Sequence, residues 1–305
     1  MSVRVGLGLA NFPFSGPRPF WRWVEMCEES RVDSIWHSER LISALPYLEP
    51  LAALAAIAGA TRRLKFGMNV VVASLRDPLL LAKQCASIDY LSDGRLLPAF
   101  GVGPATAPEW RAAGRDPAGR GRRADEVLEL CRRLWSEDGV NFQGEFFSYT
   151  DACIEPKPVQ DPLPLWIGGS SPAAIRRTAR IGTGWLAGIQ TPAQVAPVVE
   201  AIAKQAEAAG RRIDADHYGA GFGFRFGSWD EPIVERSAGL FRRLGRMDPR
   251  DYLAVGDAGA ILSRAREYQA AGISKFILRP VASDDREFLE QTRRLIDEVL
   301  PELHD

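Results

Sequence analysis

Four residues between an apolar run and a helical sequence, Gly168, Gly169, Ser170 and Ser171, have the types that suit phosphate binding. Glycines lack the Cβ atoms that keep a ligand away from the backbone, and the serines add hydroxyl groups beside a predicted helix N-terminus. Pro172 follows at the first helical position, where its missing N–H leaves the neighbouring amides to point at an anion. The same residues also suit a glycine-rich turn with a serine N-cap, so local sequence alone supports both interpretations.

A second chemical pair, Glu39 and Arg40, follows the predicted strand at 33–38. A carboxylate at such a position can have a raised pKa, so Glu39 is the candidate for proton transfer. Arg40 keeps its proton at all working pH values and is suited to hold an anionic oxygen rather than to act as a base. The alternative is a structural ion pair, either between these two residues or with another residue that supports the site. His37 should face away from Ser38 by strand alternation and pack in the core.

The elements that position these residues alternate short β-rich runs with longer amphipathic stretches, which is typical of βα units around a parallel sheet. We predict about eight strands, at 3–9, 33–38, 64–72, 95–100, 164–169, 184–189, 217–226 and 275–280. The expected fold class is α/β, a (β/α)8 TIM barrel in a single domain over 1–305, with its chemistry at the C-terminal ends of the strands. The segment from about 104 to 162, after strand four, is too long for a normal connection, so we expect an insertion covering the C-terminal mouth.

The chain has 305 residues, of which 38 are basic and 39 acidic, so nucleic acid is not an expected partner. Its four cysteines form no Cys-x-x-Cys pair and its three histidines are poorly placed as ligands, so we expect neither a metal site nor a disulfide framework. No stretch approaches the length of a membrane span, and no signal peptide is visible. These features predict a cytoplasmic protein that acts on a small-molecule substrate.

Several blocks of the sequence carry a family resemblance: "LSDGRLLPAFGVG", "RGRRADEVLELCRRLW", "PLPLWIGGSSPAAIRRTARIGTGWL" and "VGDAGAILSRAREYQAAGISKFILRP". In this order they resemble the luciferase-like monooxygenase family, whose members use FMN or the deazaflavin coenzyme F420 in a (β/α)8 barrel. The resemblance implies that the Gly168 to Ser171 corner holds the cofactor phosphate. It also implies a non-prolyl cis peptide between Asn69 and Val70, in a bulge that backs the cofactor ring.

Further cofactor residues implied by the resemblance are Ser38, which follows the second strand, and Gly101, Val102 and Gly103, which line the ring or the ribityl chain. Arg120 would supply charge to the phosphate, unless it is a solvated arginine at a helix start. Arg176, Arg177 and Arg180 would face the acidic tail that F420 carries beyond its phosphate, unless they are solvated charges on an outer helix.

The function implied is an oxidoreductase that transfers hydride between F420 and an unidentified small organic substrate. An FMN-dependent monooxygenase is the alternative within the family, and a non-catalytic flavin-binding protein is the alternative of another class. Many deazaflavin-dependent relatives carry histidine where this chain has Arg40, which puts the histidine-based mechanism in doubt. The alanine-rich stretch at 50–60 matches the region through which family members commonly form a homodimer.

Overall fold

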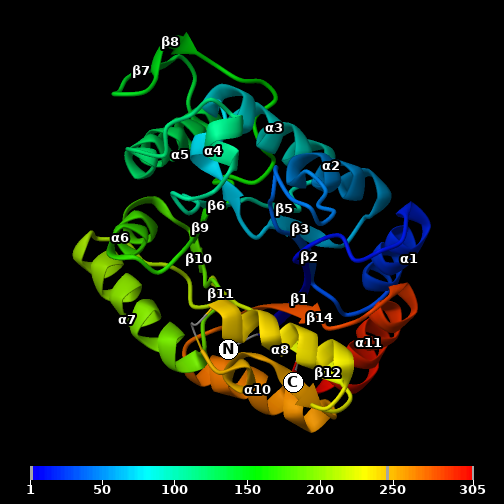
Figure 1. Ribbon diagram of the computed structural model, residues 1–305. Helices are drawn as coiled ribbons and strands as arrows, with labels where there is room; N and C mark the ends of the chain where they lie inside the picture. The colour runs from blue at the N-terminus through cyan, green and yellow to red at the C-terminus, as the bar shows by residue number, and fades with distance from the viewer. Residues whose placement is uncertain (1–2, 245–246, 304–305) are drawn as a thin grey trace.

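The β-rich runs of the sequence form a parallel sheet that curls into a TIM-like barrel, surrounded by the helices that follow each strand (Figure 1). The computed structural model describes residues 3–244 and 247–303. Its strands are β1 (Arg4–Leu9), β2 (Ser34–His37), β3 (Lys65–Met68), β4 (Val71–Val72), β5 (Leu96–Leu97), β6 (Ala99–Gly101), β9 (Trp166–Gly168), β10 (Gly184–Leu186), β11 (Tyr218–Ala220), β12 (Gly223–Phe226), β13 (Ala254–Gly256) and β14 (Lys275–Pro280), with an antiparallel hairpin of β7 (Val140–Gln143) and β8 (Ser148–Ala152).

The strand pairings run in a ring from β1 through β2 to β3, which pairs with β5, and from β4 through β6, β9, β10, β11 and β14 back to β1. Each of the eight predicted ranges contains strand, so the predicted barrel is confirmed. Three ranges are interrupted, giving β3 and β4, β5 and β6, and β11 and β12. Strand β13 was not predicted from the sequence; it has three residues and pairs with β12 directly before a helix.

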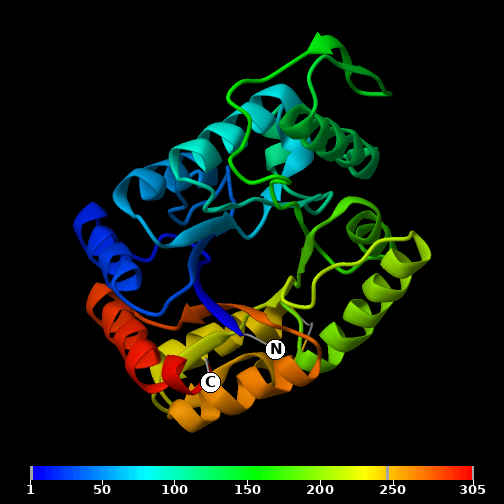
Figure 2. The ribbon, with the colours of Figure 1, turned by 180° about the vertical axis from the view of Figure 1, so that it is seen from behind.

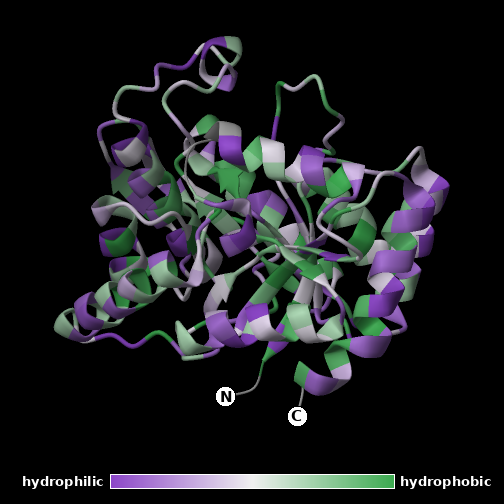
Figure 3. Cartoon of the chain, turned by 60° about the horizontal axis from the view of Figure 1, so that its bottom comes forward, coloured by the Kyte–Doolittle hydropathy of each residue, from purple (hydrophilic) through white to green (hydrophobic). Residues whose placement is uncertain are grey.

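Helices cover the outside of the sheet, and several begin with proline after a capping side chain, as in α3 after Asp77 and α7 after Thr191. They are α1 (Pro17–Glu28), α2 (Pro50–Ala60), α3 (Pro78–Leu91), α4 (Glu109–Ala112), α5 (Arg120–Ser136), α6 (Pro172–Ile181), α7 (Pro192–Ala208), α8 (Pro232–Leu244), α9 (Pro249–Tyr252), α10 (Ala258–Ala270), α11 (Asp285–Glu298) and α12 (Leu300–Leu303), with a 3-10 turn η1 (Ala73–Leu75). Figure 3 shows apolar residues concentrated on the central strands and polar residues on the outer helix faces. None of the helices described is long and apolar enough to cross a membrane.

Two tryptophans fill the interior of the barrel. The rings of Trp36 on β2 and Trp166 on β9 lie 6.2 Å apart, and because these strands are not neighbours the contact crosses the interior. A Cβ at Gly67 would come within 2.6 Å of the Trp36 ring, and one at Gly184 within 2.6 Å of Trp166. Glycine on the inner face therefore makes room for the two large rings, so the interior is a packed core.

The long segment after β6 divides into parts with different positions. Residues 103–110 lie at the carboxyl ends of the strands, where they line a cavity. Helix α5 packs against α3 as part of the outer helix ring. The turn of the β7–β8 hairpin is fixed to α5, because the Glu126 carboxylate accepts the amides of Glu145 and Phe146. Figures 1 and 2 place the hairpin outside this ring, so only the first part of the segment lies near the mouth.

Candidate active site

The break between β3 and β4 forms one side of the barrel mouth. The peptide bond between Asn69 and Val70 is cis, as predicted. The Asn69 amide donates to the His37 carbonyl at 2.8 Å, and the Ser38 hydroxyl donates to the Asn69 carbonyl at 3.2 Å. The end of β2 therefore fixes the bulge, and the structure brings together Ser38, Asn69 and Val70.

The position of the Val70 side chain explains why two of the predicted site residues, Gly101 and Gly168, are glycines. A Cβ at Gly101 would lie 2.7 Å from Val70 Cγ2, and one at Gly168 would lie 2.9 Å from Val70 Cγ1. The expectation that Gly168 leaves space for a ligand is thus wrong, because that space holds Val70. Gly103 has φ +70°, a conformation that favours glycine. Val102 packs against the hydrophobic core.

Glu39 is buried and bound to the bulge rather than to its neighbour in sequence. One carboxylate oxygen accepts the Val72 amide at 2.8 Å, and the other lies 2.6 Å from Arg76 Nη2. Arg76 also pairs with Glu49 at 2.7 Å. Burial raises the pKa of Glu39, while Arg76 acts in the opposite direction. The structural ion pair considered for Glu39 is therefore present, but its partner is Arg76 and not Arg40.

Arg40 instead pairs with Glu109, which was not among the site residues predicted from the sequence. Arg40 Nη1 lies 3.4 Å from Glu109 Oε1, and the other Glu109 oxygen is buried without a hydrogen-bond partner among the residues described. Both residues line a cavity of about 230 Å³, together with Val70 and Trp110. Nothing in the local sequence marks Glu109, apart from its place in the loop after the fourth strand.

The Gly168 to Ser171 corner connects β9 to α6. Ser171 caps the helix by accepting the Ala174 amide at 3.2 Å, and the Ser170 hydroxyl donates to Gln190 at 2.5 Å. Within the described ranges, the amides of Ser170, Ser171 and Ala173 have no protein acceptor. Gly169 has φ +105°, and a Cβ there would meet only Ala174, at 3.5 Å. The corner is therefore a capped helix start that still presents free amides.

Arg177 connects this corner to α5. Its side chain is buried, with Nε donating to Asp125 at 2.6 Å and Nη2 donating to the Gly121 carbonyl at 3.2 Å. The expectation that Arg177 faces a solvent-exposed tail is wrong, because the guanidinium is used between the helices. Arg120, at the start of α5, donates to the Gly103 carbonyl at 3.2 Å and pairs with no carboxylate in the described part of the chain. Arg120 therefore lies beside the mouth with its charge not neutralised.

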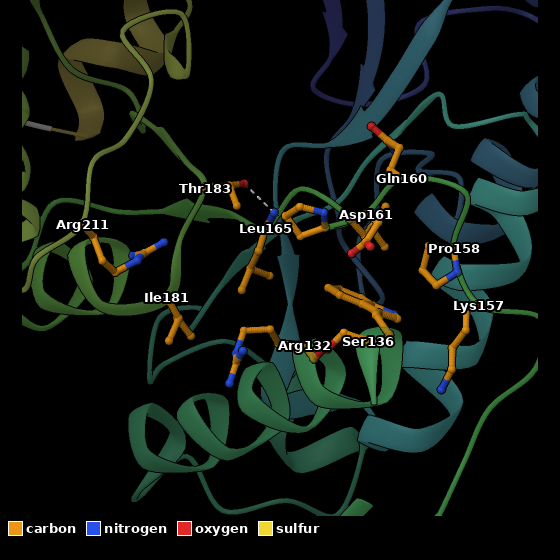
Figure 4. A pocket seen from close by; sticks show the side chains of 13 residues that line it. Arg132, Ser136, Lys157, Pro158, Gln160, Asp161, Leu165, Ile181, Thr183 and Arg211 are labelled. Atoms are coloured by element: carbon orange, nitrogen blue, oxygen red, sulfur yellow. Dashed lines mark hydrogen bonds between the residues drawn. The ribbon is translucent and has the colours of Figure 1, made fainter. Parts of the chain in front are cut away.

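A cavity of about 390 Å³ lies at the opposite, amino-terminal end of the barrel (Figure 4). Its lining includes Leu165 and Thr183, which precede β9 and β10 and share the hydrogen bond drawn in the figure. The three cations here are already bound: Arg211 donates to the Ala179 and Gly182 carbonyls, Lys157 donates to carbonyls at the end of α5, and Arg132 pairs with Glu129. This cavity is lined by groups that close helix ends, so we do not place the active site there.

His37 is buried and packs near Phe20, with ring centroids 6.1 Å apart, as expected for a core histidine. Its Nε2 has no partner in the described residues. Burial lowers the pKa of His37 from 6.5 to about 4, because the charged ring is poorly solvated.

We expect this histidine to make stability depend on pH. The unfolded chain binds a proton near pH 6.5, whereas the native chain does so only near pH 4, so the free energy of unfolding falls as the pH drops through this window. The loss should reach roughly 3 kcal/mol. Urea unfolding of the native chain and of His37→Gln between pH 7 and pH 4 measures it. Equal pH slopes in the two proteins would contradict the assignment.

Comparison with known proteins identifies the family of the chain. Residues 7–277 match the family described as luciferase-like monooxygenase, which is most of the chain. The chain belongs to the luciferase-like monooxygenase family. It is therefore a member of a family of flavin- or F420-dependent oxidoreductases.

Proteins named with either cofactor resemble the chain. The F420-dependent glucose-6-phosphate dehydrogenase of Amycolatopsis mediterranei (strain U-32) is 28% identical over 337 residues, covering 99% of this chain and 98% of that protein. The solved F420-dependent secondary alcohol dehydrogenase in complex with an F420-acetone adduct has a TM-score of 0.85 at 19% identity, with both chains covered at 100%. The oxygenating constituent of 3,6-diketocamphane monooxygenase from Pseudomonas putida, in complex with FMN, has a TM-score of 0.82 at 16% identity, with 99% of both chains covered. At these identities the two structures support the fold alone.

Proposed function

We propose that this enzyme transfers hydride between coenzyme F420 and a small organic substrate at the carboxyl ends of the barrel strands. The observation that carries the proposal is the start of α6, where the amides of Ser170, Ser171 and Ala173 have no acceptor in the described part of the chain. Arg120 begins α5, the helix that α6 contacts through the hydrogen bond from Arg177 to the Gly121 carbonyl. Free amides at a helix N-terminus attract an anion, and a nearby guanidinium adds charge. Full-length relatives that are named F420-dependent dehydrogenases favour F420 over FMN.

The residues present fit such a cofactor in two places. The α6 start and Arg120 would hold its phosphate, while Ser38, the Asn69–Val70 bulge and residues 101–103 would contact its ring. Gly169 leaves the approach open, because a Cβ there would meet only Ala174. Bound F420 supplies a carbon that accepts or gives a hydride.

Proton transfer to or from the substrate needs a side chain with a free oxygen at the cavity of about 230 Å³ that Arg40 and Glu109 line. We assign it to Glu109, whose second carboxylate oxygen has no partner among the residues described, and we assign to Arg40 the orientation of that carboxylate. Glu39 then acts as a positioning residue, because it binds the Val72 amide and Arg76.

A titration of the purified chain with F420 and with FMN tests the proposal. We expect F420 to bind at least tenfold more tightly than FMN, with an affinity that falls as salt is added, because the phosphate and tail carry charge. Arg120→Met should weaken F420 binding roughly tenfold. The matched control is Arg122→Met on the same helix, whose side chain is exposed and paired with Glu145.

Oxygen consumption separates the two chemistries. Turnover by F420 hydride transfer should proceed without oxygen uptake. Tight binding of FMN with no affinity for F420, or stoichiometric oxygen uptake during turnover, would overturn the proposal and favour an FMN-dependent monooxygenase.

We also propose that the chain forms a homodimer through α2 and α3, which pack together on one side of the barrel. Helix α3 exposes large apolar side chains there, including Leu80 at 59% and Leu91 at 76% exposure. Leu80→Glu with Leu91→Glu should shift the chain toward monomer, measured by light scattering over a broad concentration range. A monomeric wild type at every concentration would oppose the proposal.

A further inference from the structure

A cavity of about 440 Å³ lies at the carboxyl ends of β1 and β14, between these strands and α8. Helix α8 crosses this part of the barrel in Figure 1. Its walls are mainly apolar, with Leu240 and Phe241 from α8, Leu253 before β13 and Phe288 from α11. The volume suits a small organic molecule, and the lining suits an apolar body. We call this cavity the β14 pocket.

Arg279, near the end of β14, is the single charged residue in the lining described for the β14 pocket. Its Nη1 donates to the Tyr252 hydroxyl at 2.9 Å. Its Nε is buried without an acceptor, and no carboxylate in the described ranges pairs with it. A guanidinium in an apolar pocket that lacks an acidic partner is costly unless a ligand supplies the anion.

Arg225 on the neighbouring strand β12 provides the contrast. It is also near the carboxyl end of its strand, but it is fully paired with Glu231 at 2.5 Å and Glu287 at 3.2 Å. The fold therefore neutralises one arginine of this region and leaves the other facing a cavity. The difference indicates that Arg279 is kept for a ligand.

The chemistry of the pocket narrows the class of ligand. A single guanidinium, held by Tyr252, matches a planar carboxylate, which accepts two parallel N–H bonds. A phosphate dianion usually takes several cations or backbone amides, and the β14 pocket offers one cation. The hydroxyl groups of a sugar would also lose hydrogen bonds against Leu240, Phe241 and Leu253. The pocket therefore suits an organic acid with an apolar body better than a sugar phosphate.

We propose that the β14 pocket binds the carboxylate end of this enzyme's substrate, an apolar organic acid held there by Arg279, and that the reacting end extends past Asn11 and Ser38 toward the cavity of Glu109. The assignment of the occupant as substrate rests on the proposed hydride transfer at the same end of the barrel. The binding site itself stands on the geometry of Arg279 and the pocket.

Calorimetric titration of the full chain, with and without F420, tests the proposal. The probes are 4-phenylbutyrate, the neutral 4-phenylbutan-1-ol and glucose 6-phosphate. We expect the carboxylate to bind at least tenfold more tightly than the alcohol and more tightly than the sugar phosphate. Arg279→Met should remove the preference for the carboxylate, and Arg279→Lys should keep part of it. The matched control is Arg293→Met on α11, which is 54% exposed and outside the pocket, and it should leave the preference unchanged.

The outcomes separate this inference from the proposed function. Equal affinity of the acid and the alcohol for the native chain, binding of neither, or tighter binding of glucose 6-phosphate overturns the inference even if F420 binds. Retention of the preference in a folded Arg279→Met also overturns it. A carboxylate preference that depends on Arg279 supports the site even if F420 fails to bind, in which case only the cofactor assignment falls. If Arg279→Met does not fold, Tyr252→Phe takes its place. We expect Tyr252→Phe to weaken binding of the acid, but by less than the loss of the Arg279 guanidinium would.

Discussion

Gly101→Ala should weaken cofactor binding by roughly a hundredfold, although it adds a single methyl group. The new Cβ would lie 2.7 Å from Val70 Cγ2, closer than side-chain carbons normally approach. Val70 is confined on its other side, because Gly168 would meet Val70 Cγ1 at 2.9 Å if it carried a Cβ. Val70 must therefore move into the cavity that it lines with Glu109. Overpacking of this kind also costs roughly 1–3 kcal/mol of stability.

A second substitution, at Val70, should restore part of the cofactor binding that Gly101→Ala loses. Val70→Ala removes the Cγ2 methyl group that the new Cβ would meet, so the double variant Gly101→Ala with Val70→Ala should bind F420 better than Gly101→Ala alone. Such rescue is the non-additivity expected of residues in contact. Gly59→Ala on α2, where a Cβ would have no neighbour within 4 Å, is the control and should leave binding unchanged. Fluorescence titration with F420 measures the affinity. If Gly101→Ala binds F420 as tightly as the native chain does, the contact between residue 101 and Val70 does not control cofactor binding.

The barrel could be predicted from sequence because each strand and helix carries its own local signal. Runs such as 275–280 and 164–169 are apolar and end at turn residues, and the helices between them show caps and amphipathic faces. The strand β13 was missed because three residues give too short a pattern. The position of the cis peptide followed from the family resemblance, since nothing in "GMNVV" alone requires it.

The site was less predictable because its residues are defined by partners that are distant in sequence. Gly168 matches a phosphate corner in sequence, yet the Val70 side chain occupies the space beside it. Glu39 precedes Arg40 but pairs with Arg76, which folding brings from the loop after η1. Tertiary packing, rather than local sequence, thus decides which of these polar groups remain free for a ligand.

Arg225→Met should be the most destabilising single change among those considered, at about 3–5 kcal/mol of unfolding free energy. Arg225 is 6% exposed, and it donates to Glu231 before α8, to Glu287 on α11 and to the Val281 carbonyl after β14. Removing the guanidinium leaves two carboxylates facing one another without a cation. The same change at Arg279 should cost little stability, because its one described protein partner is the neutral Tyr252 hydroxyl.

The pH dependence of the loss identifies its cause. Hydrogen bonding from Arg225, followed by bonds from Ser283, lowers the pKa of Glu287 from 4.5 to about 2. Stability from this carboxylate is therefore complete above pH 4.5 and is lost as the pH falls toward 2. In Arg225→Met the Glu287 carboxylate has lost its main partner, so much of the stability that it contributes is already absent. The difference in unfolding free energy between the native chain and the variant should therefore narrow as the pH falls from 5 toward 2. Urea unfolding across this range measures the gap, with Arg293→Met as the exposed control expected within about 0.5 kcal/mol of the native chain. A gap that stays constant with pH would assign the loss to packing of the arginine stem rather than to its charge.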